Sequence, residues 1–320
     1  MNGITPLPQF GIIRARGADA VQFLQGQLTQ DVLLMGLHEA RLAAWCSAKG
    51  RMLASFVVLK PSQEEILLIC SADLLATTLK RMSMFVMRAK CKLDDATADF
   101  ELSGLIGSAA IDKLKDTKLI ANNDHMALTL VKNSENSLVY FNSGAATGLA
   151  ATARALCIRP GTGAPVGNAA QASPTPADWD WLGVESGVAV VSAAISDTFV
   201  PQMLNYESVG GVNFKKGCYP GQEVVARSQF RGTLKRRAFV VRSNCAMHAG
   251  QEVFLSDESD QPCGTVAQGA AQSSGSFSAI VSLQLAALER VANGISLRLA
   301  SSDGEPLLVG QLPYALLADI

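Results

Sequence analysis

The chain has few of the features that mark membrane, disulfide or metal proteins. No apolar run in its 320 residues approaches the roughly 20 residues that a membrane-spanning helix needs. The first residues lack the basic and apolar segments of a secretory signal, so we expect a cytoplasmic protein. The seven cysteines show no C-x-x-C spacing, which argues against a disulfide framework or a closed zinc site. The three histidines, His38, His125 and His248, are isolated, and we predict no metal site.

Charged residues are also scarce. They make up 17% of the chain and balance to a net charge of −1, which argues against a protein that coats nucleic acid. Hydrophobic residues make up 48%, enough for well-buried cores, and the length exceeds what one core usually holds. The composition therefore predicts more than one domain, with any contact to RNA confined to a local surface.

One segment departs from this balance. Residues 215–237 hold seven of the 27 Lys and Arg residues and a single acid, Glu223, whereas the rest of the chain carries 20 bases and 27 acids. Such clustering predicts a site for an anion. Its last four bases either bind carboxylates or phosphates or form a solvated face, and the sequence leaves both readings open. These four are Arg231, Lys235, Arg236 and Arg237.

A single thiol, Cys218, lies in this basic segment just before a helix predicted over 220–228. Pro220 suits the first position of that helix. The N–H groups and the dipole of the helix, together with Lys215 and Lys216, favour the thiolate over the thiol. We therefore predict a reactive cysteine; the alternative is a buried, inert cysteine that packs against the helix.

The first turn of the same helix carries Gln222 and Glu223. A carboxamide there can hydrogen-bond a heterocycle, and a carboxylate can orient a base. Arg227 follows one turn later and adds positive charge. Elsewhere, Asp31 either caps a helix or touches a ligand, and both remain open.

The remaining pattern predicts an α+β fold. Helices are expected near residues 21–24, 71–90, 107–115, 145–156 and 179–187. Strands are expected near residues 10–16, 39–46, 52–59, 65–70, 100–105, 126–131 and 137–141. Further β segments near 238–242, 252–255, 265–267, 277–283 and 295–300 are typical of a small barrel or sandwich. We predict a mixed region over 1–230 and a β domain over 231–320.

The octapeptide Lys216-Gly-Cys-Tyr-Pro-Gly-Gln-Glu223 resembles the K-G-C-[YF]-x-G-Q-E signature of YgfZ-type folate-binding proteins, which are relatives of the glycine-cleavage aminomethyltransferase. Blocks at residues 17–31, 44–51, 199–205 and 210–214 also resemble that family and occur in the expected order. The resemblance covers most of the chain.

The resemblance implies a multi-lobed aminomethyltransferase-like fold, with mixed α/β lobes around a central channel that binds tetrahydrofolate. It also implies support of iron–sulfur enzymes, including those that modify tRNA, so folate, client enzymes and tRNA are the expected partners. Aromatic side chains flank folate in such proteins, and the matching positions here are Phe10 and Trp179. The candidate cofactor-binding residues are Phe10, Trp179, Lys216, Gln222, Glu223 and Arg227, and the candidate reactive residue is Cys218.

Two other functions compete. The aminomethyltransferase branch resembles this chain but carries a Gly-Gly-x-x-Asp-Asp segment, where an acidic residue serves folate chemistry. Residues 49–55 are the corresponding block and hold no carboxylate, which argues against aminomethyl transfer here. An RNA-binding module built on the basic segment ranks third, because the chain lacks the clustered aromatic residues of common single-strand readers.

Overall fold

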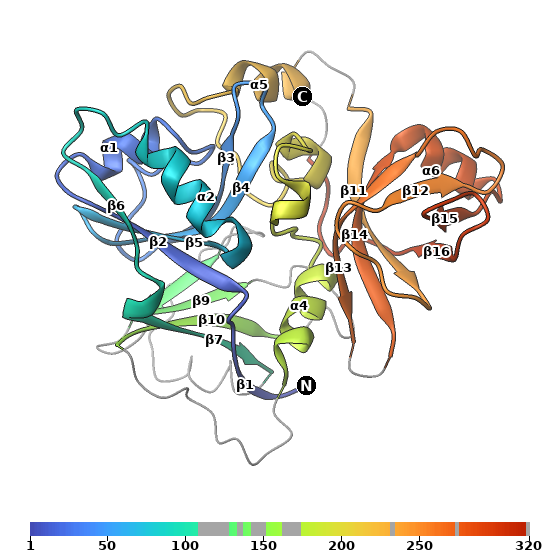
Figure 1. Ribbon diagram of the computed structural model, residues 1–320, viewed down its shortest axis with the longest axis horizontal. Helices are drawn as coiled ribbons and strands as arrows, with labels where there is room; N and C mark the ends of the chain where they lie inside the picture. Colours follow the sequence, from blue (N-terminus) through green and yellow to red (C-terminus); the bar gives the residue numbers. More distant parts are fainter. Residues whose placement is uncertain are drawn as a thin grey trace.

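Three β-sheets arranged around a central helix make up the computed structural model, which describes residues 1–107, 128–132, 137–141, 152–161, 174–230, 234–272 and 275–317 (Figure 1). Two sheets are five-stranded and open, and the third is a closed six-stranded barrel. Helix α4 (Pro176–Glu185) packs between one open sheet and the barrel. The mixed, multi-lobed architecture predicted from the sequence is therefore confirmed.

One open sheet has the strand order β3-β4-β5-β2-β6, and all its strand pairs are antiparallel. Its strands are β2 (Phe10–Arg16), β3 (Ala40–Cys46), β4 (Met52–Ser62), β5 (Glu65–Ser71) and β6 (Lys92–Asp95). The helices α1 (Ala20–Gln25) and α2 (Ala72–Ser83) belong to the same lobe. Side chains from β2, β4 and β5 are buried on both faces, so this lobe has a core on each side of its sheet.

The other open sheet has the order β1-β7-β10-β9-β8. Its strands are β1 (Gly3–Pro6), β7 (Phe100–Ile106), β8 (Thr129–Lys132), β9 (Ser137–Phe141) and β10 (Arg154–Pro160). A short 3-10 helix, η1 (Thr97–Asp99), leads into β7. Because the first strand of the chain pairs with β7, the two open sheets are interleaved in sequence.

The barrel closes in the order β11-β14-β13-β12-β15-β16. Its strands are β11 (Arg236–Ser243), β12 (Glu252–Leu255), β13 (Gly264–Ala271), β14 (Phe277–Gln284), β15 (Leu297–Leu299) and β16 (Pro306–Val309), with helix α6 (Leu285–Ala292) after β14. The 3-10 helices η3 (Ala193–Ile195) and η4 (Pro201–Leu204) and helix α5 (Gln222–Phe230) connect α4 to the barrel. The predicted small C-terminal β-barrel is confirmed, and no helix among the described residues could span a membrane.

The predicted helix over 145–156 is wrong where it can be compared. Residues 145–151 lie outside the described part, and from Arg154 the chain forms strand β10. The first three residues of this strand are buried because β7 and β9 flank it, and a short buried apolar strand cannot be told from a buried helix by its pattern. Residues 108–115 of the helix predicted near 107–115 are also outside the described part.

Helix α2 is shorter than predicted. It ends at Ser83, seven residues before the expected boundary, and the chain then forms turns in which Met87 takes a φ of 46°. Left-handed backbone cannot continue an α-helix, so Arg88 and Lys90 at the end of the predicted helix lie in turns and bends instead.

Candidate functional site

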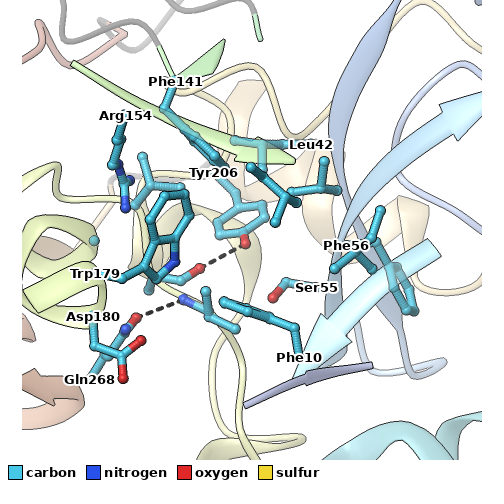
Figure 2. A pocket seen from close by; sticks show the side chains of 17 residues that line it. Phe10, Leu42, Ser55, Phe56, Phe141, Arg154, Trp179, Asp180, Tyr206 and Gln268 are labelled. Atoms are coloured by element: carbon cyan, nitrogen blue, oxygen red, sulfur yellow. Dashed lines mark hydrogen bonds between the residues drawn. The ribbon is translucent and has the colours of Figure 1, made fainter. Parts of the chain in front are cut away.

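A pocket lies where the three lobes meet. It encloses about 610 Å³ of empty space, its open mouth included. Each lobe contributes to the lining: Phe10, Leu42, Ser55, Phe56, Val57 and Ile69 come from one open sheet, Phe141, Arg154 and Leu156 from the other, and Gln268 from the barrel. The lining is completed from α4 and the chain after it by Trp179, Asp180, Gly183, Val188, Ala189, Val190 and Tyr206 (Figure 2).

Aromatic rings dominate the pocket wall. Trp179 is only 4% exposed, and its ring meets Phe141 edge to face with 5.8 Å between centroids and 79° between planes. The indole can lie this close to β7 because residue 104 is glycine; a Cβ there would sit 2.5 Å from the ring. Phe10 stands at the start of β2 on another side of the same cavity (Figure 2). The two aromatic residues predicted from the family resemblance therefore line one pocket.

Helix α4 presents Trp179 because its start is well determined. The Thr175 side chain accepts a hydrogen bond from the Asp178 backbone N–H, while the Asp178 carboxylate accepts one from the Thr175 N–H. This reciprocal capping box, with Pro176 in the first turn, holds the helix end. The helix consequently begins three residues before the predicted start.

Arg154 supplies a buried positive charge to the pocket. Its guanidinium lies 4.5 Å from the Phe141 ring centroid and 5.2 Å from that of Trp179, and its Nη2 donates to Ser186 Oγ at 2.9 Å. Burial lowers the pKa of Arg154 to about 10, an effect that the nearby Asp180 opposes. The group remains cationic at neutral pH, and stacking on two rings offsets part of its desolvation.

Asp180 supplies a carboxylate on the same side of the pocket. Its Oδ1 accepts a hydrogen bond from Gln9 Nε2 at 2.9 Å. Burial raises its pKa, whereas the Gln9 hydrogen bond and the charge of Arg154 lower it. Gln268 lies beside Asp180, and its Oε1 accepts from the Val190 N–H at 2.9 Å (Figure 2).

A second, more open hollow continues from the first. It holds about 690 Å³ of empty space, its open mouth included, and shares Phe10, Asp180, Val190 and Gln268 with the central pocket. Because these four residues line both hollows, the two adjoin, and the exposed His248 lines the second.

The signature loop lies elsewhere. Cys218 is exposed, and of the seven cysteines, all free, it alone is in that class. The buried alternative is therefore wrong. In the described part of the chain, neither hollow is lined by Cys218 or by the candidate residues Lys216, Gln222, Glu223 and Arg227.

Lys216 points inward instead of toward a ligand. Its ammonium donates to the backbone oxygens of Gln25 at 2.6 Å and Leu28 at 2.9 Å and lies 4.7 Å from the Tyr219 ring centroid. Burial lowers the pKa of Lys216 to about 8, while Asp31 and Cys218 oppose that shift. The lysine thereby ties the Cys218 loop to the end of α1.

Glu223 of the signature and Arg227 one turn later face outward on α5. Glu223 and Arg227 have side chains that are 91% and 65% exposed and lie 3.8 Å apart as an i,i+4 pair. Helix α5 begins at Gln222, because Gly221 before it takes a φ of 78° and packs against the turn at Gly50. These side chains are available to a partner at the surface.

The basic run divides between surface and core. Lys235 is exposed, whereas Arg237 is buried and forms an ion pair with Glu207 and a 2.9 Å hydrogen bond to Leu317 O. Arg231 lies outside the described residues. Asp31 caps no helix: the chain after it forms a bend, in which its Oδ1 accepts from the Leu34 N–H at 2.8 Å. The described residues contain no group of three or more His, Cys, Asp or Glu that could hold a metal.

Sequence reasoning missed Arg154, Asp180 and Gln268. They come from β10, α4 and β13 and meet only through the packing of three lobes, so no local spacing signals them. The one available signal is an acid between two tryptophans, Trp179-Asp-Trp181.

Known proteins resemble the chain in both sequence and fold. It is 30% identical to the tRNA-modifying protein YgfZ of Enterobacter sp. (strain 638) over 253 residues, or 78% of this chain and 75% of the relative. The same identity over 259 residues, with the same coverage, relates it to the protein of that name from Shigella boydii serotype 4. No family model matches the chain.

Among solved structures, the aminomethyltransferase T of the glycine cleavage system from Bartonella henselae superimposes with a TM-score of 0.65. The alignment covers 98% of this chain and 86% of that one at 16% identity, and it confirms the aminomethyltransferase-like fold. Together with the sequence identities, this fold shows that the chain belongs to the YgfZ family.

Proposed function

We propose that the central pocket binds tetrahydrofolate and that the chain is a cytoplasmic accessory protein that supports iron–sulfur enzymes and tRNA modification. One observation carries the folate assignment: a pocket of about 610 Å³ with Phe10, Phe141 and Trp179 in its wall. Sites for small ligands combine apolar walls with a few converging polar groups, and this lining does so.

The polar groups of the pocket fit a reduced pterin. A pterin is flat, so an aromatic wall suits its faces. Its edge is rich in N–H donors, and Asp180 has one carboxylate oxygen that accepts no hydrogen bond within the described part of the chain. A carboxylate accepts strongly from N–H groups, so Asp180 would hold that edge.

The accessory role is supported by the family and by the thiol. The relatives carry the name tRNA-modifying protein. Cys218 is exposed on a loop that Lys216 anchors, so a macromolecular partner could reach its sulfur. One thiolate cannot hold an iron–sulfur cluster alone, because such clusters usually need four protein ligands. We therefore assign Cys218 to a shared or transient contact with a client enzyme.

Substitutions should be able to change folate binding without changing the function of the Cys218 thiol, and the reverse. Tetrahydrofolate titration followed by tryptophan fluorescence should show a saturable change that Trp179→Phe largely removes. Trp45→Phe is the matched control, because Trp45 is buried beside Phe85 and does not line the pocket. Cys218→Ser should keep the affinity and lose support of client enzymes. Absence of saturable binding by the parent chain would refute the folate assignment.

A second candidate is folate-dependent one-carbon transfer. The half-buried Asp180 favours it, because the pocket contains a carboxylate that the block at 49–55 lacks, and burial raises the pKa of that carboxylate, which makes it a stronger base. Incubation with methylene-tetrahydrofolate and candidate amines tests this reaction. Turnover that Asp180→Asn abolishes would establish it, and no turnover would leave the accessory role.

A further inference from the structure

A glycine inside helix α4 makes room for two polar side chains at the pocket wall. Gly183 is buried, and a Cβ at this position would lie 3.3 Å from Arg154 Nη1 and 3.9 Å from Gln268 Nε2. Glycine is unfavourable inside a helix, by about 0.5–1 kcal/mol relative to alanine. Here its lack of a side chain lets a strand from one open sheet and a strand from the barrel bring their polar ends to the same point of α4.

These side chains keep part of their hydrogen-bonding capacity for a ligand. Arg154 uses Nη2 on Ser186, which in turn donates to Gly183 O at 2.6 Å. A guanidinium has five N–H donors, so most of those of Arg154 have no partner within the described part of the chain. In the same part, Gln268 uses Oε1 on Val190, which leaves its Nε2 donors, and Asp180 uses Oδ1 on Gln9, which leaves Oδ2.

Arg154 is held without an ion pair among the described residues. It is 7% exposed, and its contacts are two rings, the Ser186 hydroxyl and the more distant charge of Asp180. Its place near the C-terminal end of α4 helps, since that end of a helix favours a cation. A ligand oxygen is the partner that would use its remaining donors.

We infer that Arg154 and Asp180 read the 2-amino-4-oxo edge of a pyrimidine ring, and that Arg154 determines specificity for the 4-oxo group. This assignment rests on the proposed folate function and names the part of the ligand that each residue recognises. Asp180 accepts from the ring N–H and the 2-amino group, whereas Arg154 donates to the 4-oxo oxygen. Gln268 adds a second donor beside them (Figure 2).

The selectivity follows from the fixed character of the guanidinium. Arginine donates and never accepts, and it stays protonated at neutral pH. A 4-amino group in place of the 4-oxo group would place its N–H donors against the N–H donors of Arg154 in a desolvated site. Hydrogen bonds to charged groups are strong, so this exchange should cost about tenfold to a hundredfold in affinity.

The first test compares two ligands with the unaltered chain. Tetrahydrofolate and tetrahydroaminopterin differ in the 4-oxo and 4-amino groups and in the ring N–H beside them, and anaerobic calorimetry gives both affinities. We expect tetrahydrofolate to bind at least about tenfold more tightly. Equal affinities would overturn the edge assignment while leaving the folate proposal intact, whereas no binding of tetrahydrofolate would refute the folate proposal itself.

The second test asks whether replacing Arg154 changes the preference for the 4-oxo ligand. Arg154→Met should weaken tetrahydrofolate binding and reduce the preference for it over the 4-amino ligand, because the donor to the 4-oxo oxygen is gone while Asp180 still distinguishes the ring N–H. Arg159→Met is the matched control: Arg159 lies on the same strand, pairs with Glu101 and does not line the pocket. A preference for the 4-oxo ligand that is as large in Arg154→Met as in the parent chain would overturn the assignment of specificity to Arg154.

Gly183→Ala tests the geometry without removing a charge. The added Cβ would press on Arg154 Nη1 while alanine favours the helix. We expect unchanged or higher thermal stability together with at least fivefold weaker tetrahydrofolate binding, a combination that simple misfolding cannot give. Full affinity in a folded Gly183→Ala chain would contradict the inference.

Guanosine carries the same edge and serves as a third probe. Tighter binding of guanosine than of tetrahydrofolate would assign the pocket to a purine and refute the folate proposal.

Discussion

Gly221 of the signature is the position where an added methyl group should most destabilise the Cys218 loop. Its φ is 78°, in the left-handed region, and an added Cβ would lie 2.6 Å from Gly50 Cα. Gly50 is itself in the left-handed region, and a Cβ there would meet Val224 of α5 at 2.8 Å. The loop and the turn before β4 are therefore in backbone contact, with no side chain that could move aside.

The cost of Gly221→Ala has two parts. Left-handed backbone costs an L-residue about 1–2 kcal/mol. Forcing an extra carbon into a packed contact costs about 1–3 kcal/mol more. We expect Gly221→Ala to lower the free energy of unfolding by about 3 kcal/mol. Gly217→Ala is the matched control, because Gly217 lies in the same loop and a Cβ there would meet nothing within 4 Å.

Denaturant unfolding of both variants is the assay. Gly217→Ala should stay within about 0.5 kcal/mol of the parent chain, as surface substitutions usually do. The rate at which a thiol reagent labels Cys218 should change in Gly221→Ala and not in Gly217→Ala. Equal stabilities of the two alanine variants would refute the view that backbone contact with Gly50 fixes this loop.

Three further outcomes are expected. In the native chain Cys218 should be the fastest thiol to react with a labelling reagent, because it is exposed. Burial raises the pKa values of Cys46 and Cys70 to about 12, so these two should react only after unfolding. Fast labelling that survives in Cys218→Ser would contradict this. Burial lowers the pKa of Lys216 from 10.5 to about 8, so between these pH values the unfolded chain binds more protons than the folded chain. The free energy of unfolding should therefore rise with pH in this range, by at most about 3 kcal/mol. The rise should be steeper in the parent chain than in Lys216→Met. Because burial raises the pKa of Asp180, tetrahydrofolate affinity should fall as the pH is lowered through that pKa, and a pH profile unchanged in Asp180→Asn would argue against its role.

Local sequence patterns predicted the bounds of strands that have one buried face or that end at a turn residue. Strands β2, β9 and β12 begin and end where alternation and turn residues placed them. The pattern failed for β10, because neighbours on both sides bury it and erase the alternation that marks a half-buried strand. It also missed short β1, β6 and β16, which are four residues each and form through pairing with distant strands.

The candidate site was predictable in part. Phe10 and Trp179 came from the family resemblance, and both line the pocket. Arg154 and Asp180 could not be foreseen, because the lobes that bring them together assemble from distant parts of the chain. Lys216 shows the opposite failure: a basic residue in a signature suggested a ligand contact, but backbone oxygens near α1 use its ammonium.

The most direct test of folate binding is anaerobic calorimetry of the full chain with tetrahydrofolate. The account predicts one saturable site per chain, and Phe10→Ala should weaken it by at least about fivefold, since aromatic stacking on a flat heterocycle contributes about 1–3 kcal/mol. No saturable heat in the parent chain, or an affinity that Phe10→Ala leaves unchanged, would contradict the assignment of the central pocket.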